Sequence, residues 1–140
     1  MAVVDVWPAL LVAGTALHAG FQAGVTALVY PALADVPAEQ WERAHDRHSR
    51  RITPLVVGVY GAVLLACAGT LVLSERTVGV WLATVATAGA FTVTAGWAAP
   101  LHARLGRGRD PALVTRLLVV DRWRLGFAVV AALAAVLAGA

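Results

Sequence analysis

The sequence predicts an all-α integral membrane protein, a four-helix bundle with a short interfacial helix between the first and second spans. Three observations support this prediction, and the first two come from composition. Hydrophobic residues make up 60% of the 140 residues and charged residues 14%, whereas soluble domains are about 45–50% apolar and about 25% charged. The third is the arrangement: four apolar segments alternate with short polar connections, and the first three are each long enough, without charged residues, for the ~20 residues of a span. At this length, residues 1–140 form a single domain.

The first apolar segment, predicted to span the membrane at about residues 6–31, carries a stripe of polar side chains. Steps of three and four residues place them on one face of a helix. In lipid, such a face turns toward other helices or a wet cavity. The stripe consists of Thr15, His18, Gln22, Thr26 and Tyr30. Small residues on the same segment, Gly14, Gly20 and Gly24, favour close helix approach.

The segment Ala38–Arg51 holds two of the four histidines and four of the eleven arginines. Pro37 followed by Ala38 and Glu39 suits a first helical turn. We therefore expect a short interfacial helix that runs into the second span, at about residues 52–73. Trp41 and His45 share a face of this helix.

The third span is predicted at about residues 78–100, followed by a glycine-containing loop, Leu101–Asp110. Asp110 as N-cap and Pro111 in the first helical position then begin the fourth helix. Its span, at about residues 112–138, includes charged residues near the hydrocarbon boundary, because the uncharged remainder reaches only about 24 Å. A buried Asp121 needs a cationic partner, for which the candidates are Arg124, Arg51 and Arg104.

The arginines are concentrated in two of the connections. Ten lie after span one, or between span three and the start of span four, and only Arg76 lies on the opposite side. The positive-inside rule therefore predicts a multi-pass protein of the cell membrane, with both basic connections in the cytoplasm and both termini outside. Since these arginines flank apolar spans, their anionic partner is expected to be lipid headgroups and not nucleic acid. The sequence leaves open whether the protein forms a homo-oligomer.

The histidines are the candidate chemical groups. His18 lies at membrane depth, one helical turn from Gln22, and is a candidate general base; a hydrogen-bonded structural histidine is the alternative. His45, His48 and His102, on one predicted membrane side, could form a three-histidine metal site; histidines that bind headgroups or backbone are the alternative. The single Cys67 excludes an intramolecular disulfide and a cysteine-based zinc site.

Four segments of the chain resemble the anthrone oxygenase-like family of small four-span membrane proteins. They are Gly20–Leu33, the stretch of His and Arg residues after Trp41, Pro100–Leu105 and Arg116–Arg124. The chain departs from the family in having Leu101 and His102 after Pro100, where we expect an asparagine.

The resemblance implies oxidation of a lipophilic aromatic or polyketide-like substrate by dioxygen. A base would remove an acidic C–H proton, the carbanion would react with oxygen, and an arginine would stabilise the enolate-like charge. The cofactor is unknown, and this chemistry needs none. The catalytic candidates are then His18, Gln22, His45, His48, Arg51, His102 and Arg124, with Arg104 a further cation; the substrate-binding candidates are Tyr30, Trp41, Asp121 and Trp123.

Two other classes of function remain open. The first is a non-enzymatic membrane protein, either a transporter subunit or a module that binds a partner protein. The second is a metal- or haem-binding membrane protein, whose ligands would come from His45, His48 and His102.

Overall fold

A computed structural model describes residues 5–138, and within them it is all-helical, without strands. This confirms the predicted all-α class. There are four long helical segments. The first comprises α1 (Trp7–Gly24), a π-helical turn (Val25–Val29) and α2 (Tyr30–Ala34); after a 3-10 turn (Ala38–Gln40), the second is α3 (Trp41–Leu73). The third comprises α4 (Val78–Val93), a second π-helical turn (Thr94–Ala98) and α5 (Ala99–Leu105), and the fourth is α6 (Pro111–Ala138).

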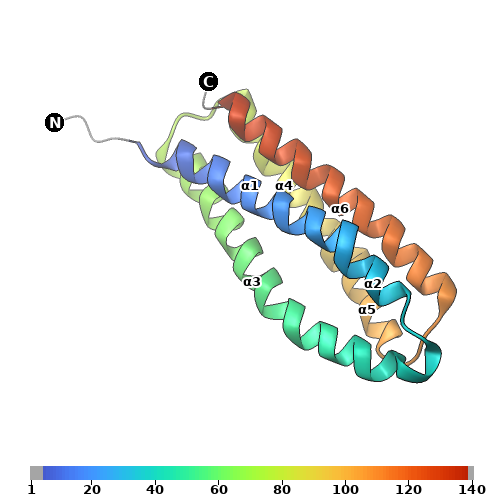
Figure 1. Cartoon of the computed structure of the whole chain (residues 1–140). Helices are drawn as coiled ribbons and strands as arrows, with labels where there is room; N and C mark the ends of the chain where they lie inside the picture. Colours follow the sequence, from blue (N-terminus) through green and yellow to red (C-terminus); the bar gives the residue numbers. More distant parts are fainter. Residues whose placement is uncertain (1–4, 139–140) are drawn as a thin grey trace.

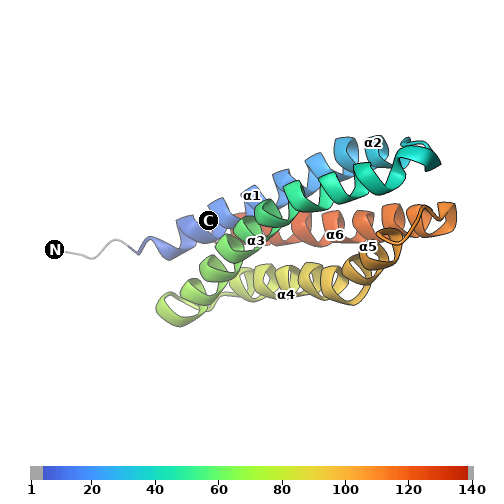
Figure 2. The ribbon, with the colours of Figure 1, turned by 90° about the horizontal axis from the view of Figure 1, so that it is seen from below.

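The four segments run side by side (Figure 1). α6 packs mainly against α4 and α1, and α1 also packs against α3, so that α6 lies between α1 and α4 when the molecule is seen from below (Figure 2). The start of α1, the end of α6 and the α3–α4 connection lie at one end of the molecule. The connections at residues 35–40 and 106–110 lie at the other end, with the arginines of residues 43–51 and 104–109 in and beside them; we call this the basic end.

The protein has its polar side chains inside and its large apolar side chains outside. Thr15, His18 and Gln22 are fully buried, whereas Leu28, Leu65 and Val85 are more than 60% exposed. A protein whose solvent is lipid is expected to have this distribution. In the described residues, three segments are long and apolar enough to cross a membrane: Trp7–Ala34, Ala38–Leu73 and Val78–Leu105. They indicate an integral membrane protein that contacts the lipid bilayer.

Two helices continue past prolines that we expected to lie at their ends. The first segment extends through Pro31 to Ala34, and the third extends through Pro100 to Leu105, so the predicted loop at residues 101–110 is only Gly106–Asp110. In each case a π-helical turn begins six residues before the proline. Since a proline ring collides with the carbonyl four residues earlier in a regular helix, the wider π turn allows the helix to continue.

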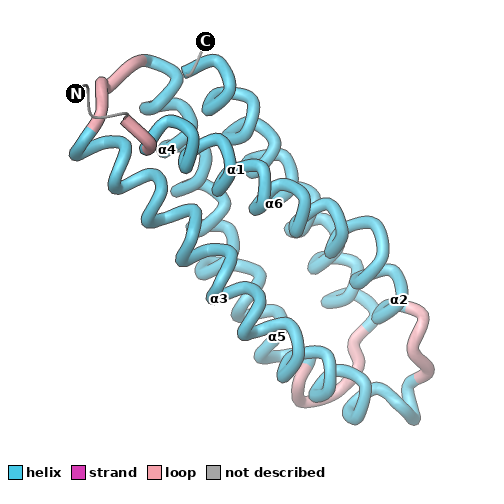
Figure 3. Tube along the Cα trace, turned by 60° about the vertical axis from the view of Figure 1, so that its left-hand side comes forward, coloured by secondary structure: helices cyan, strands magenta, loops and turns pink. Residues whose placement is uncertain are grey.

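The predicted short interfacial helix is not a separate element, because α3 is continuous from Trp41 to Leu73. Pro54 lies inside this helix, where a proline removes one hydrogen bond and bends the axis. Figures 1 and 3 both show α3 bowed away from α1 and α2 in the half nearer the basic end. At the next connection, the predicted N-cap is confirmed: Asp110 Oδ1 accepts hydrogen bonds from the backbone N–H groups of Ala112 (2.8 Å) and Leu113 (3.3 Å).

Of the three glycines expected to bring helices together, only Gly14 does so. A Cβ at Gly14 would lie 3.2 Å from Ala66 Cβ, whereas one at Gly20 or Gly24 would meet no atom within 4 Å. Among the glycines of the described residues, Gly79 comes closest to the backbone of another helix: a Cβ there would lie 2.9 Å from the carbonyl oxygen of Ala134 and 2.8 Å from Ala138 Cβ.

We expect Gly79→Ala to destabilise the protein by about 1–3 kcal/mol, because α4 and α6 must separate to admit the methyl group. Gly20→Ala is the matched control and should not lower stability, since alanine is also the better helix former. Thermal unfolding of both variants in detergent measures the difference. Equal melting temperatures would contradict the close packing of α4 on α6.

Candidate functional site

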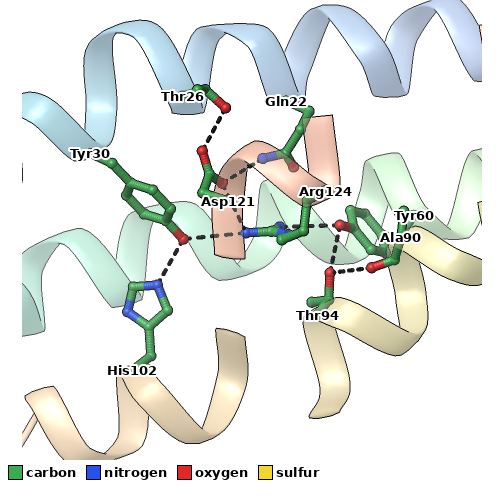
Figure 4. A network of polar contacts seen from close by, with 9 residues as sticks. All are labelled: Gln22, Thr26, Tyr30, Tyr60, Ala90, Thr94, His102, Asp121 and Arg124. Carbon is green, nitrogen blue, oxygen red and sulfur yellow. Dashed lines mark hydrogen bonds and ion pairs between the residues drawn. The ribbon is translucent and has the colours of Figure 1, made fainter. Parts of the chain in front are cut away.

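Asp121 and Arg124, on α6, form the centre of a buried polar network that joins all four long segments (Figure 4). Asp121 is 1% exposed and Arg124 is 3% exposed. Arg124 Nη1 lies 3.3 Å from Asp121 Oδ1. From α1 and the π turn that follows it, Gln22 Nε2 donates to Asp121 Oδ1 (2.6 Å) and Thr26 Oγ1 donates to Oδ2 (2.5 Å). The buried carboxylate therefore has Arg124 as its cationic partner, as predicted; Arg51 and Arg104 are exposed side chains elsewhere.

The Arg124 guanidinium also contacts two tyrosine hydroxyls. Nη2 donates to Tyr60 on α3 (3.1 Å), and Nη1 donates to Tyr30 at the start of α2 (3.3 Å). The Thr94 hydroxyl donates to the Ala90 carbonyl oxygen (2.8 Å), so the 2.9 Å contact between Tyr60 and Thr94 has Tyr60 as donor. A cation that lies between one carboxylate and two hydroxyls has its charge compensated without reaching water.

The network extends toward the basic end through two histidines. Tyr30 Oη accepts from Arg124, so its own proton is free to be donated to His102 Nε2, 2.8 Å away. His102 then has its proton on Nδ1, where it can be donated to His45 Nε2 at 3.3 Å. The hydrogen bonds therefore run in one direction, from Arg124 through Tyr30 and His102 to His45 (Figure 4 shows the part as far as His102).

Three histidine rings and one tryptophan gather around this end of the network. The ring centroids of His45 and His48 lie 5.5 and 5.8 Å from that of His102, and Trp41 stacks on His45 at 5.5 Å. Trp41 is 1% exposed and donates from Nε1 to the carbonyl oxygen of Leu105 (2.8 Å). It is therefore a core residue that holds α3 against α5. Among residues 5–138, no group of three or more His, Cys, Asp or Glu side chains could hold a metal ion.

His18 lies on the buried face of α1, against Tyr60. Its ring meets the Tyr60 ring edge-on, with centroids 4.7 Å apart. Within the described part of the chain, neither ring nitrogen of His18 has a hydrogen-bond partner, and Gln22 Oε1 has none either. The alternative of a hydrogen-bonded structural histidine is therefore not what the described residues show, and Gln22 Nε2 donates to Asp121 instead.

A pocket of about 370 Å³, which we call the central pocket, lies next to this network. Its walls come from α1, α2, α3, α5 and the two π turns, and Arg124 alone comes from α6. Thr53, Val57, Ala99 and Ala103 are exposed at its rim, so it opens between α3 and α5. The polar lining consists of Tyr30, Ser49, Thr53, Thr94, His102 and Arg124, and the apolar lining of Phe21, Val25, Ile52, Val56, Val57, Ala98, Ala99 and Ala103.

Most of the site residues predicted from the sequence lie together. Gln22, Tyr30, His45, His102, Asp121 and Arg124 belong to the network; Trp41 and His48 pack at its basic end, and His18 contacts it through Tyr60. Three predicted residues lie elsewhere: Arg51 and Arg104 are exposed, and Trp123 is 65% exposed on the outer face of α6.

Tyr60, Thr94 and the role of Thr26 were not predicted from the sequence. Tyr60 could have been recognised as a candidate, since it is the only tyrosine in the second apolar segment. For Thr94, the signal was its position six residues before Pro100, which repeats the spacing of Val25 and Pro31.

Comparison of the chain with protein-family models, with curated proteins and with solved structures finds no match.

Proposed function

We propose that the protein is a four-span membrane enzyme, with its basic end in the cytoplasm, that oxidises a lipophilic aromatic substrate with dioxygen in the central pocket. The observation that carries the proposal is the position of Tyr30, His102 and Arg124. These side chains line an otherwise largely apolar pocket and are linked by hydrogen bonds of 2.8 and 3.3 Å.

The form of the pocket supports a lipophilic substrate of small size. Its volume of about 370 Å³ falls within the ~300–1,000 Å³ that is usual for small-molecule sites. Its mouth between α3 and α5 is bordered by apolar side chains, among them Val57 at 66% exposure. A compound dissolved in the bilayer can therefore enter sideways, without passing through water.

The polar groups supply a base and a cation for a substrate with an acidic CH₂ group beside an aromatic ketone. When the Tyr30 hydroxyl turns from His102 to the substrate oxygen, His102 Nε2 is free to accept a proton from that carbon, and the carbanion is delocalised as an enolate. The Arg124 guanidinium and the Tyr30 hydroxyl stabilise the negative oxygen. The proton acquired by Nε2 can be matched by release from Nδ1 toward His45 Nε2, 3.3 Å away.

The oxidant in this proposal is dioxygen. The carbanion forms a C–O bond with O₂ and gives a peroxide. Loss of the second C–H proton, with cleavage of the O–O bond, leaves a new carbonyl group and releases hydroxide, which is protonated to water. One CH₂ group and one O₂ thus become one C=O group and one H₂O.

Oxygen uptake by the purified protein, with anthrone as the probe substrate, tests this function. We expect one O₂ consumed per quinone formed, at a rate well above the spontaneous reaction. A probe that binds without oxygen uptake would instead favour a non-enzymatic binding protein.

We expect Tyr30→Phe to lower this turnover by about 10- to 100-fold, since it removes a hydrogen bond to a charged group, worth about 1.5–3 kcal/mol. Trp123→Phe, on the outer face of α6, is the control and should leave the rate unchanged. If Tyr30→Phe had the rate of the wild-type protein, the tyrosine would have no part in the reaction.

A further inference from the structure

A second hollow lies between the third segment and α6, and we call it the α5–α6 groove. It has a volume of about 480 Å³ and shares no lining residue with the central pocket. Trp97, Leu101 and Arg104 line it from one side, and Arg116, Val119 and Val120 line it from the other. It is therefore a separate site on the outside of the molecule.

The lining of the groove changes from cationic to apolar along its length. α5 ends at Leu105 and α6 begins at Pro111, so both helices meet the Gly106–Asp110 connection at the basic end. Arg104 lies in the last turn of α5, and Arg116 lies near the start of α6. Trp97, Val119 and Val120 lie further from that end. A ligand that fits must have a charged head and an apolar tail.

Neither arginine has an ion-pair partner among the described residues. In residues 5–138, the only ion pairs are Asp46–Arg50 and Asp121–Arg124. Two guanidinium groups on opposite walls of one groove are complementary to a phosphate, which they can contact through several N–H groups.

We propose that the α5–α6 groove binds an anionic phospholipid. Its phosphate lies between Arg104 and Arg116, and an acyl chain lies against Trp97 and Val119. Basic hollows between membrane helices bind acidic lipid headgroups in this way. The apolar half of the groove favours a lipid over a free phosphate, because a free phosphate would make no contact with Trp97 and Val119.

Lipid titration of the full-length protein in neutral detergent tests the proposal, with binding followed by native mass spectrometry and by the melting temperature. The probes are phosphatidylglycerol, phosphatidylcholine with the same acyl chains, and inorganic phosphate. We expect phosphatidylglycerol to bind more tightly than phosphatidylcholine. Since each arginine contributes about 1 kcal/mol, Arg104→Gln or Arg116→Gln should weaken it about 5-fold, and the double variant about 30-fold.

Matched variants separate this site from general surface charge. The pair Arg43→Gln and Arg107→Gln removes the same charge from exposed positions at the same end, outside the groove, and should keep most of the affinity. The pair Arg104→Lys and Arg116→Lys keeps the charge and should lose less than the glutamine pair. If the double glutamine variant does not fold, the affinity of either single glutamine variant for phosphatidylglycerol tests the proposal.

Three results would overturn the proposal. Equal affinity for the two lipids would show that the headgroup charge is not recognised. Equal losses in the groove pair and the control pair would show binding to the basic end as a whole. A melting shift from inorganic phosphate as large as that from phosphatidylglycerol would show an anion site without a place for the acyl chain.

Discussion

Replacing His102 with glutamine is expected to lower the proposed oxidation by about 10²–10⁴-fold, which is the usual contribution of a general base. His102 is the only histidine that lines the central pocket, and its Nε2 is the acceptor for Tyr30. Glutamine can keep a hydrogen bond to Tyr30 but cannot take up the substrate proton. The rate of oxygen uptake at saturating substrate measures the loss, and equilibrium binding of the substrate should change little.

The matched control is His48→Gln. The His48 ring lies 5.8 Å from that of His102, but His48 does not line the central pocket, and its Nε2 has no hydrogen-bond partner in the described part of the chain. We expect this variant to keep most of its activity. If the two variants lost activity equally, the histidines would act as a structural cluster, and His102 would not be the base.

The largest loss of stability is expected when one member of the buried ion pair is removed. Asp121→Leu leaves the Arg124 guanidinium without its carboxylate, and Arg124→Met leaves the carboxylate without its cation. Either change should lower the free energy of unfolding by about 3–5 kcal/mol, because an uncompensated charge stays inside the protein. Unfolding by denaturant in detergent, followed by helical circular dichroism, measures this free energy.

The double variant, Asp121→Leu with Arg124→Met, should be less destabilised than the sum of the two single variants, because no unpaired charge remains. The exposed pair Asp46–Arg50 provides the comparison: Asp46→Ala should cost no more than about 1 kcal/mol. Additive losses at Asp121 and Arg124 would mean that each residue acts through its other partners and that the ion pair itself contributes little.

Local patterns predicted much of the fold and part of the site. Apolar segment length predicted the helices. The steps of three and four from Thr15 to Gln22 predicted a buried polar face, which the structure confirms. Asp110 was recognised as an N-cap because capping depends on neighbouring residues. Asp121 was predicted to need a cationic partner because a buried carboxylate requires one, and the structure shows that, of the three candidates, Arg124 is that partner.

The position of Tyr30 shows what such patterns cannot supply. We predicted Tyr30 to lie on the same face as His18, but each of the three steps of four between them adds about 40°, so in a regular helix Tyr30 would lie about 120° around the axis from His18. The π turn at Val25–Val29 takes up one extra residue and reduces this angle to about 20°. Tyr30 therefore faces the network because of a backbone insertion before Pro31, and π turns are frequent at functional sites.

Composition and periodicity alone establish that the chain is helical, that its segments are long and apolar, and that polar side chains on the first segment face inward. These properties depend on residues within one or two helical turns of each other. The contacts of His102 with Tyr30 and His45, of Gln22 with Asp121 and of Tyr60 with Arg124 join residues that lie 57 to 99 positions apart in the sequence. Only the packing of the four segments brings these groups to one pocket, with α3 bowed near Pro54 and both π turns contributing to the pocket lining. Side-chain hydrogen bonds act over about 3 Å. No local pattern in the sequence specifies which helices approach that closely.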